Sequence, residues 1–281
     1  MKFSFKVAPQ DKGMKLLYFL RDHCQDAPSV KALKRAIDGK KCRVNGRIET
    51  FSTHPLNVGD IVEIDLAAPA KKTNLTILFE DDELCICDKP AGITCTPENF
   101  PALLVHRLDK ETSGILILAK TEAMRQKMIT LFAEKSMYKA YLALVDGSVT
   151  KEEGTITTRL AKKHTYQGQT IYGSAAKGQV AITNWTLLEA GKKASLLLCE
   201  PVTGRTHQLR VHLKEMGHPI LGDAQYAKRF TSFYEPPRVL LHAYRVRFTH
   251  PTSGEEVEIT TPPPEDFLMA LEDLDISSEN L

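Results

Sequence analysis

The sequence of 281 residues contains no segment of the kind that enters or crosses a membrane. No run reaches the roughly 18 uninterrupted apolar residues that a membrane-spanning helix needs. The first residues, MKFSFKVAPQDKG, hold no apolar core of the length typical of a signal peptide. We therefore expect a cytoplasmic protein without a membrane partner.

The sequence also lacks an excess of one charge and any cysteine spacing typical of zinc sites. Its 37 Lys and Arg residues nearly balance 35 Asp and Glu residues, for a formal net charge of +2, so binding to a charged partner would depend on local patches.

His207, His212 and His218 are separated by five and six residues, which does not place them on one helix face, so no metal site is expected. The six cysteines match no paired zinc pattern, and we interpret them as buried thiols. They are Cys24, Cys42, Cys85, Cys87, Cys95 and Cys199.

Residues 1–66 have the pattern of a small α+β module. The segments MKLLYFLRDHC and VKALKRAI carry apolar residues at helical spacing, CRVNGRI is typical of a hairpin with its turn at Asn45-Gly46, and NVGDIVEIDL alternates as a strand. Basic side chains gather here with Asp38 as the one nearby acid, and they are Lys31, Lys34, Arg35, Lys40, Lys41, Arg43 and Arg47. On charge alone, a solvated helix face and a nucleic-acid surface are both open.

The order of these elements resembles a small RNA-binding module first known from a ribosomal small-subunit protein, the S-four domain. The resemblance covers about residues 13–66. It implies a surface that binds RNA phosphates through its cations, with an affinity that falls as salt rises.

The rest of the chain is predicted to form one larger domain. Residues 67–74, AAPAKKTN, have the composition of a linker. From residue 75 most segments have strand patterns, with helical spacing in EAMRQKMITLFAEK and THQLRVHLKEMG. Many strands with a few inserted helices predict an α+β domain with a mainly antiparallel, mixed sheet over residues 75–268. The acidic segment EDFLMALEDLDISSENL is expected to form a short helix and a frayed tail, with the tail at residues 269–281.

One carboxylate stands out because of its neighbours. The segment LLVHRLDKETSGILILAKT sets Asp109 among His106, Arg107 and Lys110, directly before an apolar strand. A lone Asp at a turn is usually a structural acid. Here the cations would keep Asp109 ionised and the buried strand would hold it in place, which favours a reactive group as the alternative.

The block HRLDKETSG resembles the central motif of RluA-type pseudouridine synthases nearly residue for residue. Four further blocks resemble that family in the same order, namely EDDELCICDKPAGI, KAYLALVDG, VTGRTHQLRVHLKEMGHPILGDAQY and LLHAYRVRFTHP. The match spans about residues 75–268. It implies an isomerase that detaches the base of a uridine within RNA, turns it and rejoins it through carbon 5. No cofactor is implied, because the product is an isomer of the substrate.

The resemblance also implies roles for three residues in the reaction. Asp109 falls at the family's aspartate, a nucleophile that could attack the ribose anomeric carbon or carbon 6 of the uracil. Tyr141 falls at the family's tyrosine, which could stack on the uracil or act as a base. The alternative is a tyrosine that only packs in the core of the sheet. Arg210 most plausibly falls at the active-site arginine, where it would orient Asp109. Arg205 is the competing choice and could instead hold a phosphate.

Three more residues are substrate-binding candidates. Leu221 falls where the family places an apolar wall for the base, although without the resemblance an apolar residue here would be interpreted as part of the core. Arg107 would fill the stack that a flipped uridine leaves, since a guanidinium plane stacks well on bases; a surface salt bridge with Asp109 or Glu111 is the alternative. His106 is the third candidate.

One polar segment and the identity of the RNA are left open. Residues 161–179, AKKHTYQGQTIYGSAAKGQ, interleave lysines with Tyr166 and Tyr172, which suits either RNA contact or an exposed loop. Ribosomal RNA is the favoured substrate and transfer RNA the other, and a monomer is expected. Two competing hypotheses are a non-catalytic RNA-binding protein on the same scaffold and a metal-dependent hydrolase that uses the histidines.

Overall fold

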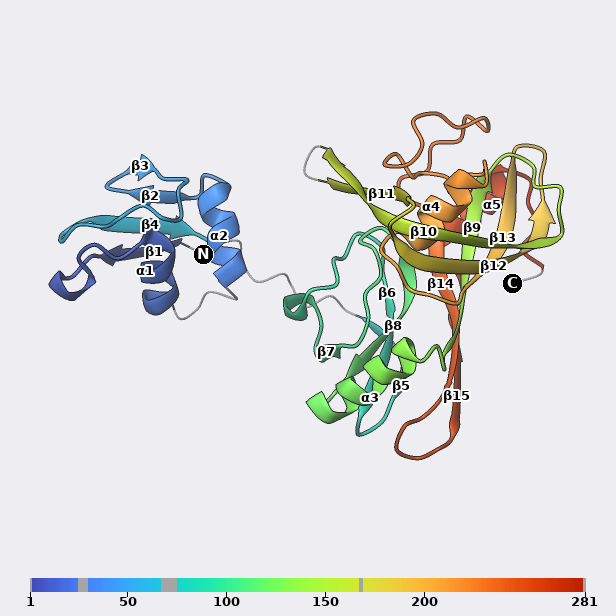
Figure 1. The fold of residues 1–281 in the computed structure, drawn as a ribbon, viewed down its shortest axis with the longest axis horizontal. Coiled ribbons are helices and arrows are strands. Elements are labelled where there is room, and N and C mark those ends of the chain that lie inside the picture. The colour runs from blue at the N-terminus through green and yellow to red at the C-terminus, as the bar shows by residue number, and fades with distance from the viewer. Residues whose placement is uncertain (1, 25–29, 67–74, 167–168, 280–281) are drawn as a thin grey trace. The chain divides into compact units, whose positions relative to one another are not determined.

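The structure is a computed structural model that describes residues 2–24, 30–66, 75–166 and 169–279 (Figure 1). The chain divides into two compact units, Met1–Thr73 and Asn74–Leu281, which are described one at a time. The predicted linker, residues 67–74, lies outside the described residues. Within the described ranges, no helix is long and apolar enough to cross a membrane.

The first unit is a small sheet covered by two helices. The strands run in the order β1-β4-β2-β3, and neighbouring strands are antiparallel. Asn45 and Gly46 have φ values of 51° and 77°, as the predicted hairpin turn requires. The elements are β1 (Lys2–Lys6), a 3-10 turn (Pro9–Asp11), α1 (Leu16–His23), α2 (Val30–Asp38), β2 (Cys42–Val44), β3 (Arg47–Ile48) and β4 (Ile61–Asp65).

Helix α2 separates an apolar face from a basic one. Leu33 and Ile37 are buried in the core of the first unit, and the Lys34 and Arg35 side chains between them are exposed. This pattern follows from the helical repeat, because positions three and four residues apart share a face. The cations of this unit are therefore solvent-facing where their side chains are described.

The second unit is built around an 11-stranded sheet in its described part, with the order β11-β10-β12-β13-β9-β14-β8-β6-β5. Strand β15 pairs with β14, and β7 pairs with β8. The β14–β8 pair is parallel and the other strand pairs among the described residues are antiparallel, so the predicted mainly antiparallel, mixed sheet is confirmed. The strands are β5 (Thr76–Glu80), β6 (Leu84–Lys89), β7 (Leu103–Leu104), β8 (Ser113–Ala119), β9 (Tyr138–Asp146), β10 (Glu153–Tyr166), β11 (Gln169–Ser174), β12 (Gln179–Ala190), β13 (Ala194–Pro201), β14 (Leu241–Thr249) and β15 (Glu256–Thr260).

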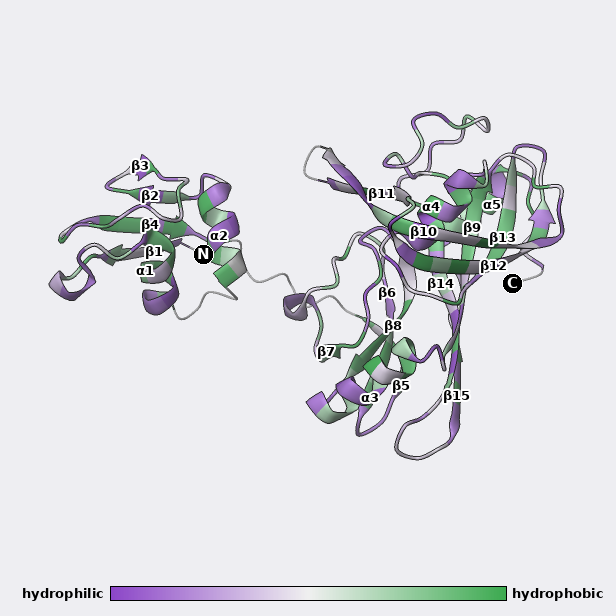
Figure 2. Cartoon of the chain, viewed as in Figure 1, coloured by the Kyte–Doolittle hydropathy of each residue, from purple (hydrophilic) through white to green (hydrophobic). Residues whose placement is uncertain are grey.

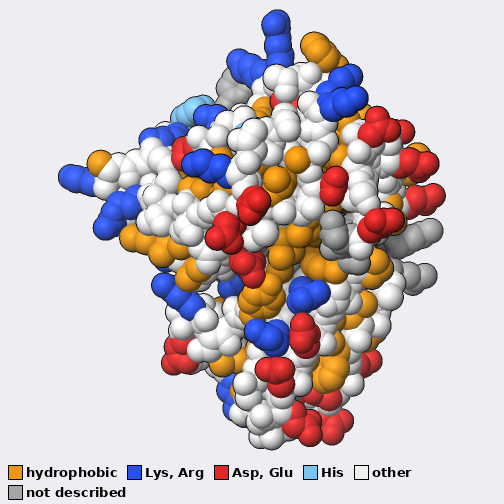
Figure 3. All heavy atoms as spheres, turned by 90° about the vertical axis from the view of Figure 1, so that its right-hand side faces the viewer, with side chains coloured by type: hydrophobic (Ala, Val, Ile, Leu, Met, Phe, Trp, Pro, Cys, Tyr) orange, Lys and Arg blue, Asp and Glu red, His pale blue; other side chains and the backbone are white. Residues whose placement is uncertain are grey.

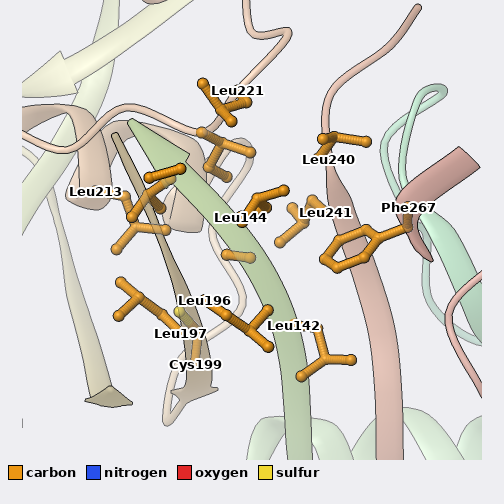
Figure 4. Close-up of a cluster of buried hydrophobic side chains, with 14 of the residues drawn as sticks. Leu142, Leu144, Leu196, Leu197, Cys199, Leu213, Leu221, Leu240, Leu241 and Phe267 are labelled. Carbon is orange, nitrogen blue, oxygen red and sulfur yellow. The ribbon is translucent and has the colours of Figure 1, made fainter. Parts of the chain in front are cut away.

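Three α-helices and three clusters of buried apolar side chains complete the second unit in its described part. The helices are α3 (Glu122–Ala133), which lies against β7 and β8, α4 (Gln208–Glu215), which lies against β10, β11 and β12, and α5 (Glu265–Asp273). Strand β8 is buried at every position, so its SGILILA sequence is apolar throughout instead of alternating. The hydrophobic colouring of the central strands in Figure 2 follows these clusters, and Figure 4 shows one of them, with Leu142, Leu144 and Leu197 from β9 and β13.

The expected short helix near the end of the chain is α5, and the folded unit continues through it beyond residue 268, where the tail was expected to begin. Phe267, Ala270 and Leu271 are buried in the same cluster as Leu144, and Ile276 is buried there too. Their spacing gives α5 one apolar face, whereas its acidic residues lie on the opposite side. The expected short helix is thus present, and only the point at which the tail begins differs.

Residues 161–179 differ from the exposed loop that was one of the two expectations. Most of this segment belongs to β10 and β11, which pair in antiparallel register from Leu160↔Ser174 to Tyr166↔Gln169. Strand β11 is the last strand on its side of the sheet, so this hairpin carries its lysines at the sheet edge.

Candidate active site

Strand register brings the loop of Asp109 next to Tyr141. Tyr141 on β9 pairs with Ala243 on β14, and Ala243 pairs with Gly114 on β8, five residues after Asp109. Gly114 has a φ of 105°, and a Cβ at this position would lie 2.3 Å from the carbonyl oxygen of Ala243. Only glycine permits this approach of two backbones. The loop then closes with a hydrogen bond of 3.1 Å from the Thr112 N–H to the Asp109 carbonyl.

Arg210 connects Asp109 to a second, buried carboxylate. Its Nη1 lies 3.3 Å from Asp109 Oδ2, while Nε and Nη2 donate to the two oxygens of Asp223 at 2.7 and 2.8 Å. Nη2 also donates to Gln225 Oε1 at 2.7 Å. Burial disfavours the charge of Arg210, but the hydrogen bonds and charges of its carboxylate partners outweigh burial and raise its pKa. The guanidinium is therefore a fixed cation beside Asp109.

His207 and Tyr226 complete the wall around this cation. His207, the N-cap of α4, has a φ of 56° and places Nε2 3.9 Å from Asp109 Oδ1. Its Nδ1 lies 2.8 Å from Tyr226 Oη, and the Arg210 Cζ lies 5.0 Å from the centre of the Tyr226 ring. Burial lowers the pKa of His207 although the charge of Asp109 opposes this, so we expect a neutral imidazole at neutral pH.

The phenol of Tyr141 is held in its protonated form. Burial, followed by the negative charge of Asp109, raises the pKa of Tyr141 far above its ordinary value. A phenolate ready to act as a base at neutral pH is therefore disfavoured in the free protein. Its ring remains suited to stacking against a base placed beside Asp109.

Comparison with known proteins agrees with this geometry. A family model described as RNA pseudouridylate synthase matches residues 83–215, which include Asp109, Tyr141 and Arg210. The ribosomal large subunit pseudouridine synthase C of Vibrio vulnificus is 31% identical over 286 residues, covering 89% of each chain. The chain belongs to the RNA pseudouridine synthase family. It is therefore an isomerase that acts on RNA.

Other relatives place the synthase in the same family. Ribosomal large subunit pseudouridine synthase D of Zymomonas mobilis is 32% identical to it, over 78% of this chain and 80% of the relative. The solved structure of human RNA pseudouridylate synthase domain containing 1 aligns with a TM-score of 0.61 at 30% identity, covering 70% of this chain and 87% of that one. The solved structure of human RNA pseudouridylate synthase domain containing 4 aligns with a TM-score of 0.60 at 24% identity, which shows the shared fold alone.

Two predicted substrate-binding residues of the synthase, His106 and Leu221, have structural partners. The Nε2 of His106 accepts a hydrogen bond of 3.0 Å from the Ile117 N–H of β8, and burial lowers the pKa of His106 to about 3. Leu221 has no exposed surface and packs in the apolar cluster of Figure 4. These contacts give both side chains a structural role, and their roles in binding the substrate stay predictions.

Arg107 and Arg205 are exposed, as a role in RNA contact requires. Within the described ranges, no ion pair to Arg107 is found, so the salt bridge with Asp109 or Glu111 that was the alternative role does not form. The Nε of Arg205 donates to the Val180 carbonyl at 3.1 Å, and Arg205 is not in contact with Asp109 in the way that Arg210 is. Of the two arginines considered for the active site, Arg210 is the one beside Asp109.

A groove with a volume of about 650 Å³ borders Arg205. Its lining includes three cations, Lys162, Lys177 and Arg205, together with the ring of Tyr172. That ring lies 5.5 Å from the ring of His207, so the groove adjoins the wall around Asp109. Figure 3 shows that Lys and Arg side chains also gather toward one margin of the face that it presents, apart from most of the acidic ones.

The sequence hypothesis missed the residues that hold Arg210, and it considered the histidines only as metal ligands. Asp223 and Tyr226 lie in the block GDAQY that carried the resemblance, but nothing in their local pattern pairs them with α4. His212 bonds to Thr158 and Thr183, and His218 bonds to the Asp146 carbonyl, so the histidines have separate partners. Among described residues, no group of three or more His, Cys, Asp or Glu is placed to hold a metal ion.

Proposed function

We propose that the synthase isomerises uridines of ribosomal RNA and that Asp109 is its nucleophile. One observation carries the choice of Asp109. Arg210 contacts two carboxylates, and the side chain of Asp223 is 1% exposed whereas that of Asp109 is 28% exposed. The buried Asp223 holds the guanidinium of Arg210, and the accessible Asp109 is left for the substrate.

In the proposed reaction a carboxylate oxygen of Asp109 forms a bond to the nucleotide while the bond between the ribose and nitrogen 1 breaks. Attack at the anomeric carbon gives an ester and a free uracil anion, and attack at carbon 6 gives an adduct of the base. In either case the base turns, carbon 5 bonds to the ribose, and the bond to Asp109 breaks. Carbon 5 then loses its proton and nitrogen 1 takes one up, so the product is an isomer of the substrate. Arg210 keeps the carboxylate oriented, and the ring of Tyr141 stacks on the uracil.

The uridine must leave its stack to reach Asp109, at a cost of a few kcal/mol. We assign Arg107 to the vacated place, because its exposed guanidinium has no ion-pair partner among the described residues and is free to stack. The RNA strand next to the flipped nucleotide would lie in the groove of Lys162, Lys177 and Arg205, where cations meet phosphates and Tyr172 offers an aromatic face.

The decisive test replaces Asp109 with asparagine. We expect Asp109→Asn to abolish tritium release from RNA labelled at carbon 5 of uridine, while affinity for that RNA stays within about threefold, because shape is kept and the nucleophile is lost. Asp82→Asn is the matched control, since Asp82 is exposed on the β5–β6 turn. Full activity of Asp109→Asn would contradict the assignment. RNA binding without isomerisation by the unmodified protein would instead favour a non-catalytic role.

The choice of ribosomal RNA is supported by the names of the relatives from Vibrio vulnificus and Zymomonas mobilis. We further propose that the first unit binds structured RNA as an S-four-like module through Lys31, Lys34, Arg35, Lys40, Lys41 and Arg43. Pseudouridines would be mapped in total RNA with and without the gene. Loss of sites in large-subunit RNA is expected, and loss confined to transfer RNA would contradict the proposal. The cytoplasmic location and the monomeric state stay predictions.

A further inference from the structure

The backbone around Asp109 is held by hydrogen bonds to its carbonyl groups. The carbonyl of Asp109 accepts from the Thr112 N–H at 3.1 Å, and the carbonyl of Lys110 accepts from the Gly92 N–H at 2.8 Å. The carbonyl of Glu111 accepts from Arg238 Nη1 at 3.2 Å. Three consecutive carbonyls, from Asp109 to Glu111, are therefore fixed, and the third depends on a side chain from a distant segment.

Arg238 is itself fixed by α5. Its Nη2 donates to Asp266 Oδ1 at 2.7 Å, and its Nε donates to the other oxygen of the same carboxylate. The hydrogen bond from Arg238 is the main cause that lowers the pKa of Asp266, so this carboxylate is ionised at neutral pH. A bidentate pair fixes the plane of a guanidinium, and this plane aims Nη1 at the carbonyls of Glu111 and Val239.

The same segment also borders the residue that holds Arg210. A Cβ on Gly222 would lie 1.9 Å from the Arg238 carbonyl oxygen, so the two backbones are in direct contact immediately before Asp223. Asp109 is thus supported in two ways. Its side chain is held by Arg210, which Asp223 fixes, and its backbone loop is held at the Glu111 carbonyl. Arg238 contacts both supports, through its carbonyl at Gly222 and its guanidinium at Glu111.

We propose that Arg238 and Asp266 are a positioning pair that sets the Asp109 loop for attack, which makes α5 a working part of the active site. The inference rests on the proposed role of Asp109. A nucleophile must be held within about 0.5 Å of its productive position, and a displacement of about 1 Å lowers a rate by about a hundredfold. Neither residue of the pair touches the substrate; both act through the Glu111 carbonyl.

The test uses Asp266→Asn in the full chain, because Asp266 is 35% exposed and its replacement threatens the fold less than replacement of Arg238, which is 5% exposed. Under single-turnover conditions, we expect the rate constant of tritium release to fall by about tenfold to a hundredfold. The fraction of RNA converted and the affinity for RNA should stay as in the unmodified protein. Glu265→Gln is the matched control, since Glu265 is exposed in the same first turn of α5.

The readout separates positioning from stability. A merely structural pair would, on removal, lower the fraction of active protein and leave the rate constant of the folded molecules unchanged. Arg238→Lys keeps the charge but cannot form the fork, so we expect the same slow rate constant as for Asp266→Asn, and the double variant should be no slower than either. A normal rate constant for Asp266→Asn would refute this inference alone, provided that Asp109→Asn is inactive. An active Asp109→Asn would refute the proposed function instead.

Discussion

Replacing Gly114 with alanine tests whether the contact between β8 and β14 builds the active site. The new Cβ would lie 2.3 Å from the Ala243 carbonyl oxygen and 2.7 Å from its nitrogen, and these are backbone atoms that cannot turn aside. The residue would also keep a φ of 105°, which alanine rarely adopts. Backbone strain of about 1–3 kcal/mol and overpacking of about 1–3 kcal/mol should together lower the free energy of unfolding by about 2–6 kcal/mol.

A second glycine separates these two effects. Gly254 has a φ of 76° with no atom within 4 Å of an added Cβ, so Gly254→Ala should carry the strain without the clash. Urea unfolding of the second unit can be followed through Trp185, the single tryptophan of the chain, which is buried on β12. At about 3 kcal/mol per molar urea, an extra 3 kcal/mol lowers the midpoint of Gly114→Ala by about 1 M relative to Gly254→Ala. Equal midpoints would refute the argument that close approach requires this glycine.

Three further predictions concern the first unit, the substrate base and pH. The double variant Lys34→Gln, Arg35→Gln should reduce the slope of log affinity for RNA against log salt by about 1.5, and an unchanged slope would mean that neither cation meets a phosphate. Tyr141→Ala should weaken binding of the target RNA by about 1–3 kcal/mol, whereas Tyr141→Phe should not. If Tyr141→Ala bound as tightly as the unmodified protein in a filter-binding assay, stacking would be excluded. Burial holds the pKa of His106 at about 3 in the folded protein, so the unfolded chain takes up the proton first as pH falls. Below pH ~6.5 this residue should lower the stability of the second unit by about 1.4 kcal/mol per pH unit, and His106→Gln should flatten that decline in urea titrations at several pH values.

Elements whose signal is local could be predicted from the sequence. The hairpin at Asn45-Gly46, the buried strand after Asp109 and the helix that contains Arg210 each follow from turn chemistry or from the spacing of apolar residues. The cysteines are buried, as was expected of thiols without a zinc pattern. These features depend on neighbours within a few positions, which the sequence displays directly.

Contacts between distant segments could be predicted only through the family resemblance, or not at all. Asp109 and Arg210 are 101 residues apart, and their pairing depends on how β8, β9 and β14 are ordered in the sheet. The partner of Arg210 at Asp223 is set by the backbone path through Gly222, which no periodicity records. The hydrogen bond from the Ile117 N–H to His106 could not be predicted for the same reason, because it forms only when the chain folds back on β8.

The burial of the cysteines has a practical consequence for studying how the synthase binds RNA. All six are buried, and burial raises the pKa of several of them, to about 11 for Cys42 and about 12 for Cys87 and Cys199. Thiolates are the reactive form, so the native thiols should resist labelling in the folded protein. A cysteine introduced on the surface of each unit would then accept a spin label selectively. The distance between the two labels, measured with and without RNA, would report how the substrate arranges the two units.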